Sequence, residues 1–80
     1  MNWHVYKAMV NYLENVMCLP EEIIKRNGNK AMASWFKAKE WSDFTQTTIT
    51  GQRLTSMYNA GLVTRRKSVE GPYEYWPIIK

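Results

Sequence analysis

Five small or medium-sized polar side chains recur at helical spacing in the second half of the chain, and none of them is charged. A helix from about residue 48 to residue 60 would place them on one side, opposite Leu54. A purely solvated helix face would usually carry Glu and Lys instead. Hydroxyl and amide groups are what a helix needs to contact base edges and phosphates in a DNA groove. The five residues are Thr48, Gln52, Thr55, Ser56 and Asn59.

Basic residues adjoin this predicted helix. Arg53 lies on its flank, where the stem can pack while the guanidinium reaches out to guanine or a phosphate. Further on, Arg65, Arg66 and Lys67 would lie along an adjacent minor groove or phosphate backbone and displace counterions. Tyr73 would stack on a sugar or support the returning strand. The bland alternatives are plain solvent exposure for the polar face and a solubilising edge strand for the three cations.

The helix is expected to end sharply and to lead into a hairpin. Gly61 suits the left-handed conformation that ends many helices. Residues 62–67 then form a strand that becomes basic, residues 70–72 form a turn, and residues 73–76 alternate as a returning strand. Pro77 is expected to stop that strand.

A shorter helix from about residue 38 to residue 45 is expected to precede the polar one. Trp41 and Phe44 lie three residues apart, so both fall on one side of such a helix. They would pack it against Leu54 and Met57 of the second helix. The pair of helices and the hairpin together are therefore expected to form one compact unit.

Several finer expectations concern the polar helix itself. Thr47 or Thr48 would cap its first turn with a hydroxyl group. Thr50 and Tyr58 fall on the apolar side with Leu54 and are expected to face the core. Gly51 would face the preceding helix, where its missing side chain allows a close crossing that offsets the ~1 kcal/mol cost of glycine in a helix.

The run LTSMYNAGLVTRR resembles the signature of the winged helix-turn-helix family, in which a recognition helix leads into a basic β-wing. The preceding segment KAKEWSDF resembles the first helix of the pair, and the resemblance covers roughly residues 36–78. It implies an α+β fold of three to four helices followed by a two-stranded wing. It also implies binding of double-stranded DNA, as a small transcriptional regulator or an accessory factor in replication or recombination. The compact build resembles proteins of bacteriophages and mobile elements. Winged helices also serve as docking modules, so a host protein partner is the alternative. Single-stranded nucleic acid held by stacked aromatic residues is a third reading, which we favour less because the core and the wing account for the spacing of the Tyr and Trp residues.

The first half of the chain is expected to supply scaffold helices. Residues 2–17 are expected to form a helix with an apolar stripe at helical spacing. The stripe comprises Trp3, Tyr6, Val10, Leu13 and Met17, and it is widened by Met9, Val16, Val5 and Tyr12. Residues 20–28 have acids at the start, bases at the end and Gly28 as the residue that follows the helix. Residues 31–35 are ambiguous between the start of a helix through Trp41 and a loop that enters a short strand at residues 35–36.

Composition favours a polyanionic partner and gives no support to catalysis. The 80 residues, taken as one domain, carry a net charge of +4, and residues 25–67 hold nine Lys or Arg against two acidic residues. The single cysteine, Cys18, permits no internal disulfide, and neither it nor the single histidine, His4, has the neighbours of a catalytic group. We expect no enzyme activity, metal or cofactor, no membrane span and a cytoplasmic location. A monomer and a homodimer through the first helix both remain open.

Overall fold

The computed structural model describes residues 2–30 and 35–79. Those residues form a small α+β unit with four α-helices, one π-helical turn and a three-stranded antiparallel sheet, which confirms the expected α+β class. The sheet has one strand more than the expected two. In chain order the elements are α1 (Asn2–Asn11), η1 (Tyr12–Val16), α2 (Glu21–Lys30), β1 (Phe36–Lys37), α3 (Ala38–Thr45), α4 (Gly51–Asn59), β2 (Val63–Lys67) and β3 (Tyr73–Pro77).

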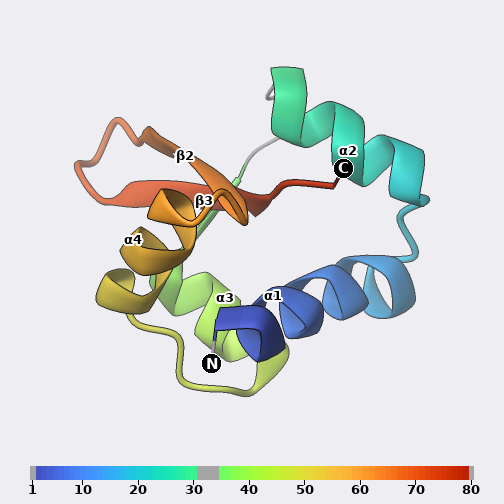
Figure 1. Ribbon diagram of the computed structural model, residues 1–80, viewed down its shortest axis with the longest axis horizontal. Helices are drawn as coiled ribbons and strands as arrows, with labels where there is room; N and C mark the ends of the chain where they lie inside the picture. The colour runs from blue at the N-terminus through green and yellow to red at the C-terminus, as the bar shows by residue number, and fades with distance from the viewer. Residues whose placement is uncertain (1, 31–34, 80) are drawn as a thin grey trace.

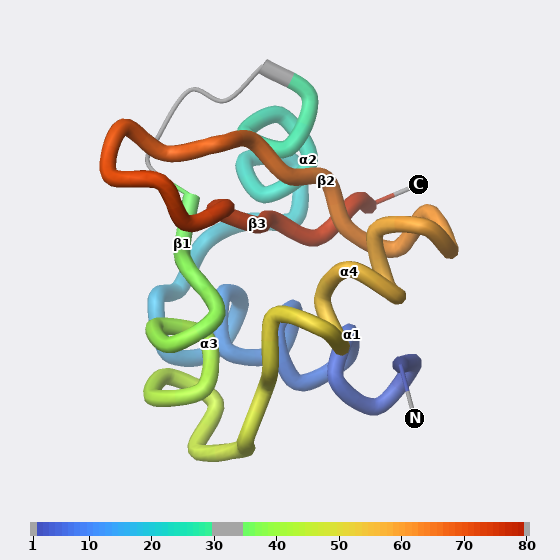
Figure 2. The backbone as a smooth tube through the Cα atoms, turned by 90° about the vertical axis from the view of Figure 1, so that its left-hand side faces the viewer, coloured from blue at the N-terminus to red at the C-terminus, as the bar shows by residue number. Residues whose placement is uncertain are grey.

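The sheet lies between two layers of helices. Its strand order is β1-β3-β2, so the last strand of the chain is the central one. Figures 1 and 2 show α2 on one side of the sheet and α1, α3 and α4 on the other. The third strand resolves the ambiguity before α3, because Phe36 pairs with Tyr75 and Lys37 pairs with Glu74. Residues 31–34 of the ambiguous segment lie outside the described residues.

Two tryptophans fasten the central strand to both helix layers. The indole N–H of Trp76 donates to the backbone oxygen of Ile24 in α2 at 2.8 Å. The indole N–H of Trp41 in α3 donates to the backbone oxygen of Tyr75 at 3.0 Å. Both rings are almost fully buried, so each combines a large apolar burial with a satisfied polar atom. The position of β3 is therefore fixed from above and below.

Helix α2 continues past Gly28, which the sequence had suggested as the residue following the helix. A Cβ built on Gly28 would lie 3.2 Å from the Pro77 carbonyl oxygen and 3.2 Å from the Trp76 ring. The glycine therefore serves a close approach between α2 and β3, and it does not end the helix. That correction could come only from knowing which strand packs against α2.

The first helix buries a narrower stripe than expected. Val5, Met9 and Leu13 are in the core, whereas Trp3 and Met17 are exposed. After Asn11 the helix widens into η1, where the Met17 N–H donates to the Tyr12 oxygen at 3.1 Å. The wider turn moves the last residues away from the core face. The burial expected for Val16 and Met17 was wrong for this reason, and the burial expected for Trp3, in the first turn of α1, was also wrong.

Helix α3 begins and ends where the sequence predicts, but α4 begins at Gly51, three residues later than expected. Ile49 is buried and held in an extended segment, because Ser42 donates to its carbonyl oxygen at 2.8 Å and accepts from its N–H at 2.7 Å. The helix therefore starts after Ile49. Its cap is Thr50, whose hydroxyl oxygen accepts from the Arg53 N–H at 3.1 Å.

Three expectations about the start of α4 are therefore corrected. Neither Thr47 nor Thr48 caps the helix, and Thr50 lies at its exposed end and not in the core. Gly51 makes no close helix crossing, since a Cβ at this position would meet nothing within 4 Å. Its presence has no packing reason in the described part of the chain.

The end of α4 follows the prediction. Gly61 has φ +78°, in the left-handed region, and the Leu62 N–H donates to the Met57 oxygen at 2.9 Å. This turn directs the chain straight into β2. The hairpin β2–β3 therefore starts at a fixed angle to the C-terminal end of α4.

Candidate nucleic-acid interface

The solvent side of α4 carries uncharged polar side chains. Gln52, Ser56 and Asn59 are exposed and Thr55 is half-buried, while Leu54 and Met57 fill the core on the other side. Thr48 is exposed too, but it lies in the loop before the helix. Four of the five predicted polar residues therefore share the helix, and Thr48 approaches the same surface only from its N-terminal end.

The N-terminal residue of α1 reaches the flank of this helix. The Asn2 side chain donates to the Ser56 hydroxyl oxygen at 3.1 Å and accepts from the Arg53 guanidinium at 3.4 Å. The contact lines a small polar cleft of about 240 Å³ together with Thr50 and Gln52. The bond to Asn2 thus holds the Arg53 guanidinium beside the first turn of α4, although the residue is exposed.

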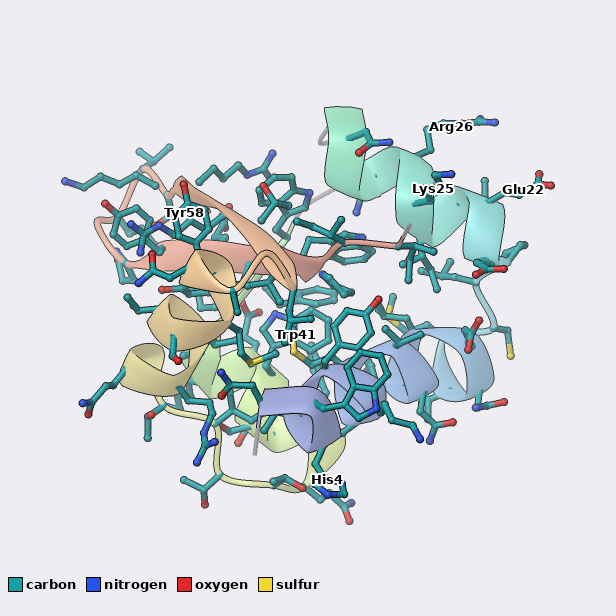
Figure 3. All side chains as sticks on the ribbon, in the orientation of Figure 1. His4, Glu22, Lys25, Arg26, Trp41 and Tyr58 are labelled. Carbon is teal, nitrogen blue, oxygen red and sulfur yellow. The ribbon has the colours of Figure 1, made fainter. Side chains whose placement is uncertain are left out.

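Arg65 on β2 lies against two tyrosine rings at the other flank of α4. Its guanidinium carbon is 4.2 Å from the ring centroid of Tyr58 in α4 and 4.3 Å from that of Tyr73 in β3. Figure 3 shows Tyr58 beside the β2–β3 hairpin, at the end of α4 that leads into it. Rings stacked on a guanidinium leave its N–H groups pointing outward in the plane, where they can donate to a phosphate or a base edge.

Arg66, the next residue, points to the opposite face of the hairpin. Its Nε donates to the Glu74 carboxylate at 3.0 Å, and its guanidinium lies 4.7 Å from the Trp35 ring centroid, on the α2 side of the sheet. Alternation along a strand returns Lys67 to the side of Arg65, where it is exposed. The three cations therefore do not lie along a single surface. The alternation rule alone would have separated them.

The tip of the β2–β3 hairpin is held to the body of the protein. Lys37, which precedes α3, forms an ion pair with Glu70 in the turn of the hairpin. The hydrogen bond from Lys37 lowers the pKa of the Glu70 carboxyl below its ordinary 4.5, and the same bond raises the pKa of Lys37. The turn itself closes with the Gly71 N–H donating to the Ser68 oxygen at 3.1 Å.

Tyr58 is the interface residue that sequence reasoning missed. It was expected in the core, but 40% of its surface is exposed. The helical pattern placed it only at the border of the apolar face, and its ring packs on Arg65 instead. The sequence did offer one signal for this contact. Tyr58 lies at the border of the apolar helix face, and the next predicted strand carries Arg65, which can pack on its ring.

A second surface lies along α1, away from the polar face of α4. A groove of about 490 Å³, here called the α1 groove, opens between α1 and the C-terminal residues. Trp3, 56% exposed, stacks on Tyr6 with 5.1 Å between ring centroids. Burial, with the nearby Glu21 and Glu14 carboxylates, raises the pKa of the Tyr6 hydroxyl above its ordinary 10.0. Apolar side chains such as Val10, Leu62 and Ile78 thus line the groove together with the carboxylates of Glu14 and Glu21.

Residues suited to catalysis are dispersed. His4 and Cys18 are both exposed, and Figure 3 shows His4 pointing into solvent from α1. Among the residues that the structure describes, no group of three or more His, Cys, Asp or Glu side chains is placed to hold a metal ion. Within residues 2–30 and 35–79, no helix is both long and apolar enough to cross a membrane.

Comparisons of the chain with models of protein families, with curated proteins and with solved structures found no match. The function proposed for this chain therefore depends on its own fold and surface chemistry. Three features carry the most weight: the polar face of α4, Arg65 with its neighbours Tyr58 and Tyr73, and the α1 groove.

Proposed function

We propose that this protein binds double-stranded DNA as a winged helix. Helices α3 and α4 would form the helix pair, with α4 in the major groove and the β2–β3 hairpin as the wing on the adjacent strand. The order of the elements supports this assignment. Helix α4 leads through a single tight turn into the hairpin, and β1 pairs with the edge of β3 that β2 leaves free. The angle between helix and wing is thereby fixed before DNA is bound.

One observation carries the proposal. The exposed face of α4 is polar and uncharged, and it lies next to a guanidinium that two aromatic rings hold in place. A face built only for solubility would carry charges at these positions, as the outer side of α2 does with Glu22, Lys25 and Arg26. Neutral donors and acceptors are instead what base edges require.

Each residue then has a distinct role. Gln52 can bond an adenine edge with both atoms of its amide, and Thr55, Ser56 and Asn59 offer shorter contacts to bases or phosphates. Arg53 and Thr48, at the start of α4, would contact the phosphates that enter this end of the groove. Arg65 and Lys67 would contact the backbone beside the wing, and Arg66 would hold the wing in shape.

A salt titration tests the proposal. Binding of the protein to a pool of mixed-sequence duplex DNA is expected to weaken linearly on a log–log plot, with a slope of about −0.9 for each phosphate contacted. The Gln52→Ala/Asn59→Ala variant should keep this slope and lose preference among sequences selected from the pool. No binding to duplex DNA at low salt would overturn the proposal.

The α1 groove supports a second candidate, a module that docks on another protein. An exposed Trp stacked on Tyr is a common anchor in protein interfaces. Glu14 and Glu21 also line the groove, so an apolar segment with a basic residue would fit it best. Binding through this groove should depend weakly on salt and should be lost in a Trp3→Ala variant. DNA binding should be unaffected by that substitution, which separates the two candidates.

A further inference from the structure

Tyr58 and Tyr73 are more exposed than a supporting role for Arg65 requires. They come from different elements, one from α4 and one from β3, and 40% and 41% of their surfaces remain open to solvent. Tyr75, two residues along β3 from Tyr73, shows the contrast, because it is 4% exposed and belongs to the core. Two large, partly exposed rings thus contact Arg65 at a flank of α4.

Aromatic rings and a guanidinium recognise different parts of a nucleic acid. The in-plane N–H groups of Arg65 suit a phosphate, whereas the face of each tyrosine ring that Arg65 does not cover suits the face of a base. In an intact duplex the base faces are covered by their neighbours in the stack. Only an unpaired base, at an overhang, a bulge or a melted step, can present its face to these rings.

We propose that Tyr58, Arg65 and Tyr73 form a stacking site for an unpaired DNA base next to the duplex that α4 holds. This inference rests on the proposed DNA binding and adds a substrate preference to it. The rings would stack on the base while the Arg65 guanidinium binds the phosphate of the same or the next nucleotide. The protein is then expected to prefer a duplex with a short single-stranded extension to the same duplex with a blunt end.

Fluorescence anisotropy with two labelled duplexes tests the preference. Both share one mixed sequence, and one of them ends in an overhang of a few thymidines. The overhang is expected to raise affinity about five- to 150-fold, the range for stacking one base on an aromatic side chain. In a Tyr58→Leu/Tyr73→Leu variant the ratio of the two affinities should fall to about one, whatever affinity for the blunt duplex is lost because Arg65 is no longer held by the rings.

Matched variants keep the test decisive. Tyr58→Phe/Tyr73→Phe retains both rings and should retain the preference. This variant separates loss of the rings from a general effect of substitution at these two positions. Equal affinity of the parent for both duplexes would overturn the inference and leave the DNA-binding proposal standing. An equal loss on both duplexes in the leucine variant would also overturn it, because the rings would then act only through Arg65. Absence of binding to either duplex would overturn both.

Discussion

Replacing Arg65 with alanine is expected to weaken DNA binding, whereas the same replacement of Arg66 should leave it almost unchanged. The two residues are neighbours with the same charge, so a net-charge effect predicts equal results. The structure separates them, because Arg65 faces Tyr58 and Tyr73 while Arg66 bonds to Glu74 on the other side of the hairpin. Local geometry therefore predicts unequal results.

The effect on stability should be similar for the two variants. Arg65→Ala removes two cation–π contacts, each contributing about 0.5–1 kcal/mol at an exposed site. Arg66→Ala removes one such contact with Trp35 and an ion pair with Glu74 whose side chains are 36% and 19% exposed. A pair this open to solvent contributes only about 0.2–1 kcal/mol. Each variant should thus lose about 1–2 kcal/mol of unfolding free energy in a denaturant titration.

The effect on binding should differ. Losing one phosphate contact makes the log–log salt slope about 0.9 less steep. Between 50 and 200 mM salt, the affinity of Arg65→Ala should then fall about 3.5-fold less than that of the parent. Arg66→Ala should match the parent slope. Arg65→Lys keeps the charge but not the flat, stacked guanidinium, and it should fall between the two. Equal slopes for Arg65→Ala and Arg66→Ala would refute the reasoning.

Three further predictions follow from single contacts. Gly51→Ala should raise the unfolding free energy by about 0.5 kcal/mol, because the added Cβ meets nothing. Thr50→Ala should lower it by about 1 kcal/mol, because the helix cap is lost. Denaturant titrations should therefore show changes of opposite sign for the two variants. Gly28→Ala should destabilise by about 1 kcal/mol, because overpacking against β3 exceeds the gain in helix propensity, and a rise in thermal midpoint would contradict this. Because the folded-state pKa of Glu70 is lowered, its ion pair stabilises the fold above the ordinary value of 4.5 and is lost as pH falls through the lowered pKa. Carboxyl NMR titration should show that lowered midpoint in the parent and the ordinary one in Lys37→Met.

Local pattern was enough to predict the parts of the fold that depend on neighbours in sequence. The bounds of α3 follow from Trp41 and Phe44 three residues apart, and the stop after α4 follows from the conformation that Gly61 allows. The hairpin strands followed from their alternation and turn residues, although Pro77, expected to stop the second strand, is its buried last residue and pairs with Val63. In each case the residues that decide the structure lie within one or two turns of each other.

The errors arose where distant residues decide the structure. Helix α4 starts late because Ile49 is buried and clamped by Ser42, seven residues earlier and in another helix. Gly28 continues a helix because Trp76 packs on it, 48 residues away in the chain. Helical pattern gives no information about either contact, since both depend on how the layers assemble.

The sequence predicted most residues of the candidate site, but it did not predict how their side chains are arranged. The polar face of α4 was visible from spacing, but the contacts from Asn2 to Arg53 and Ser56 join residues that are 51 and 54 positions apart in the chain. The position of Tyr58 depended on Arg65, which lies beyond a helix stop. Strand alternation could have placed Arg65 and Arg66 on opposite faces from the sequence alone.

The most direct test of DNA binding through α4 and the wing is to map the contact surface by NMR. Isotope-labelled protein is titrated with a mixed-sequence duplex at low salt, and the backbone amide shifts are followed. The largest changes are expected on α4 from Gln52 to Asn59 and at Arg65 and Lys67, with α1 around Tyr6 unaffected. Changes confined to the α1 groove, or no changes at all, would contradict the account.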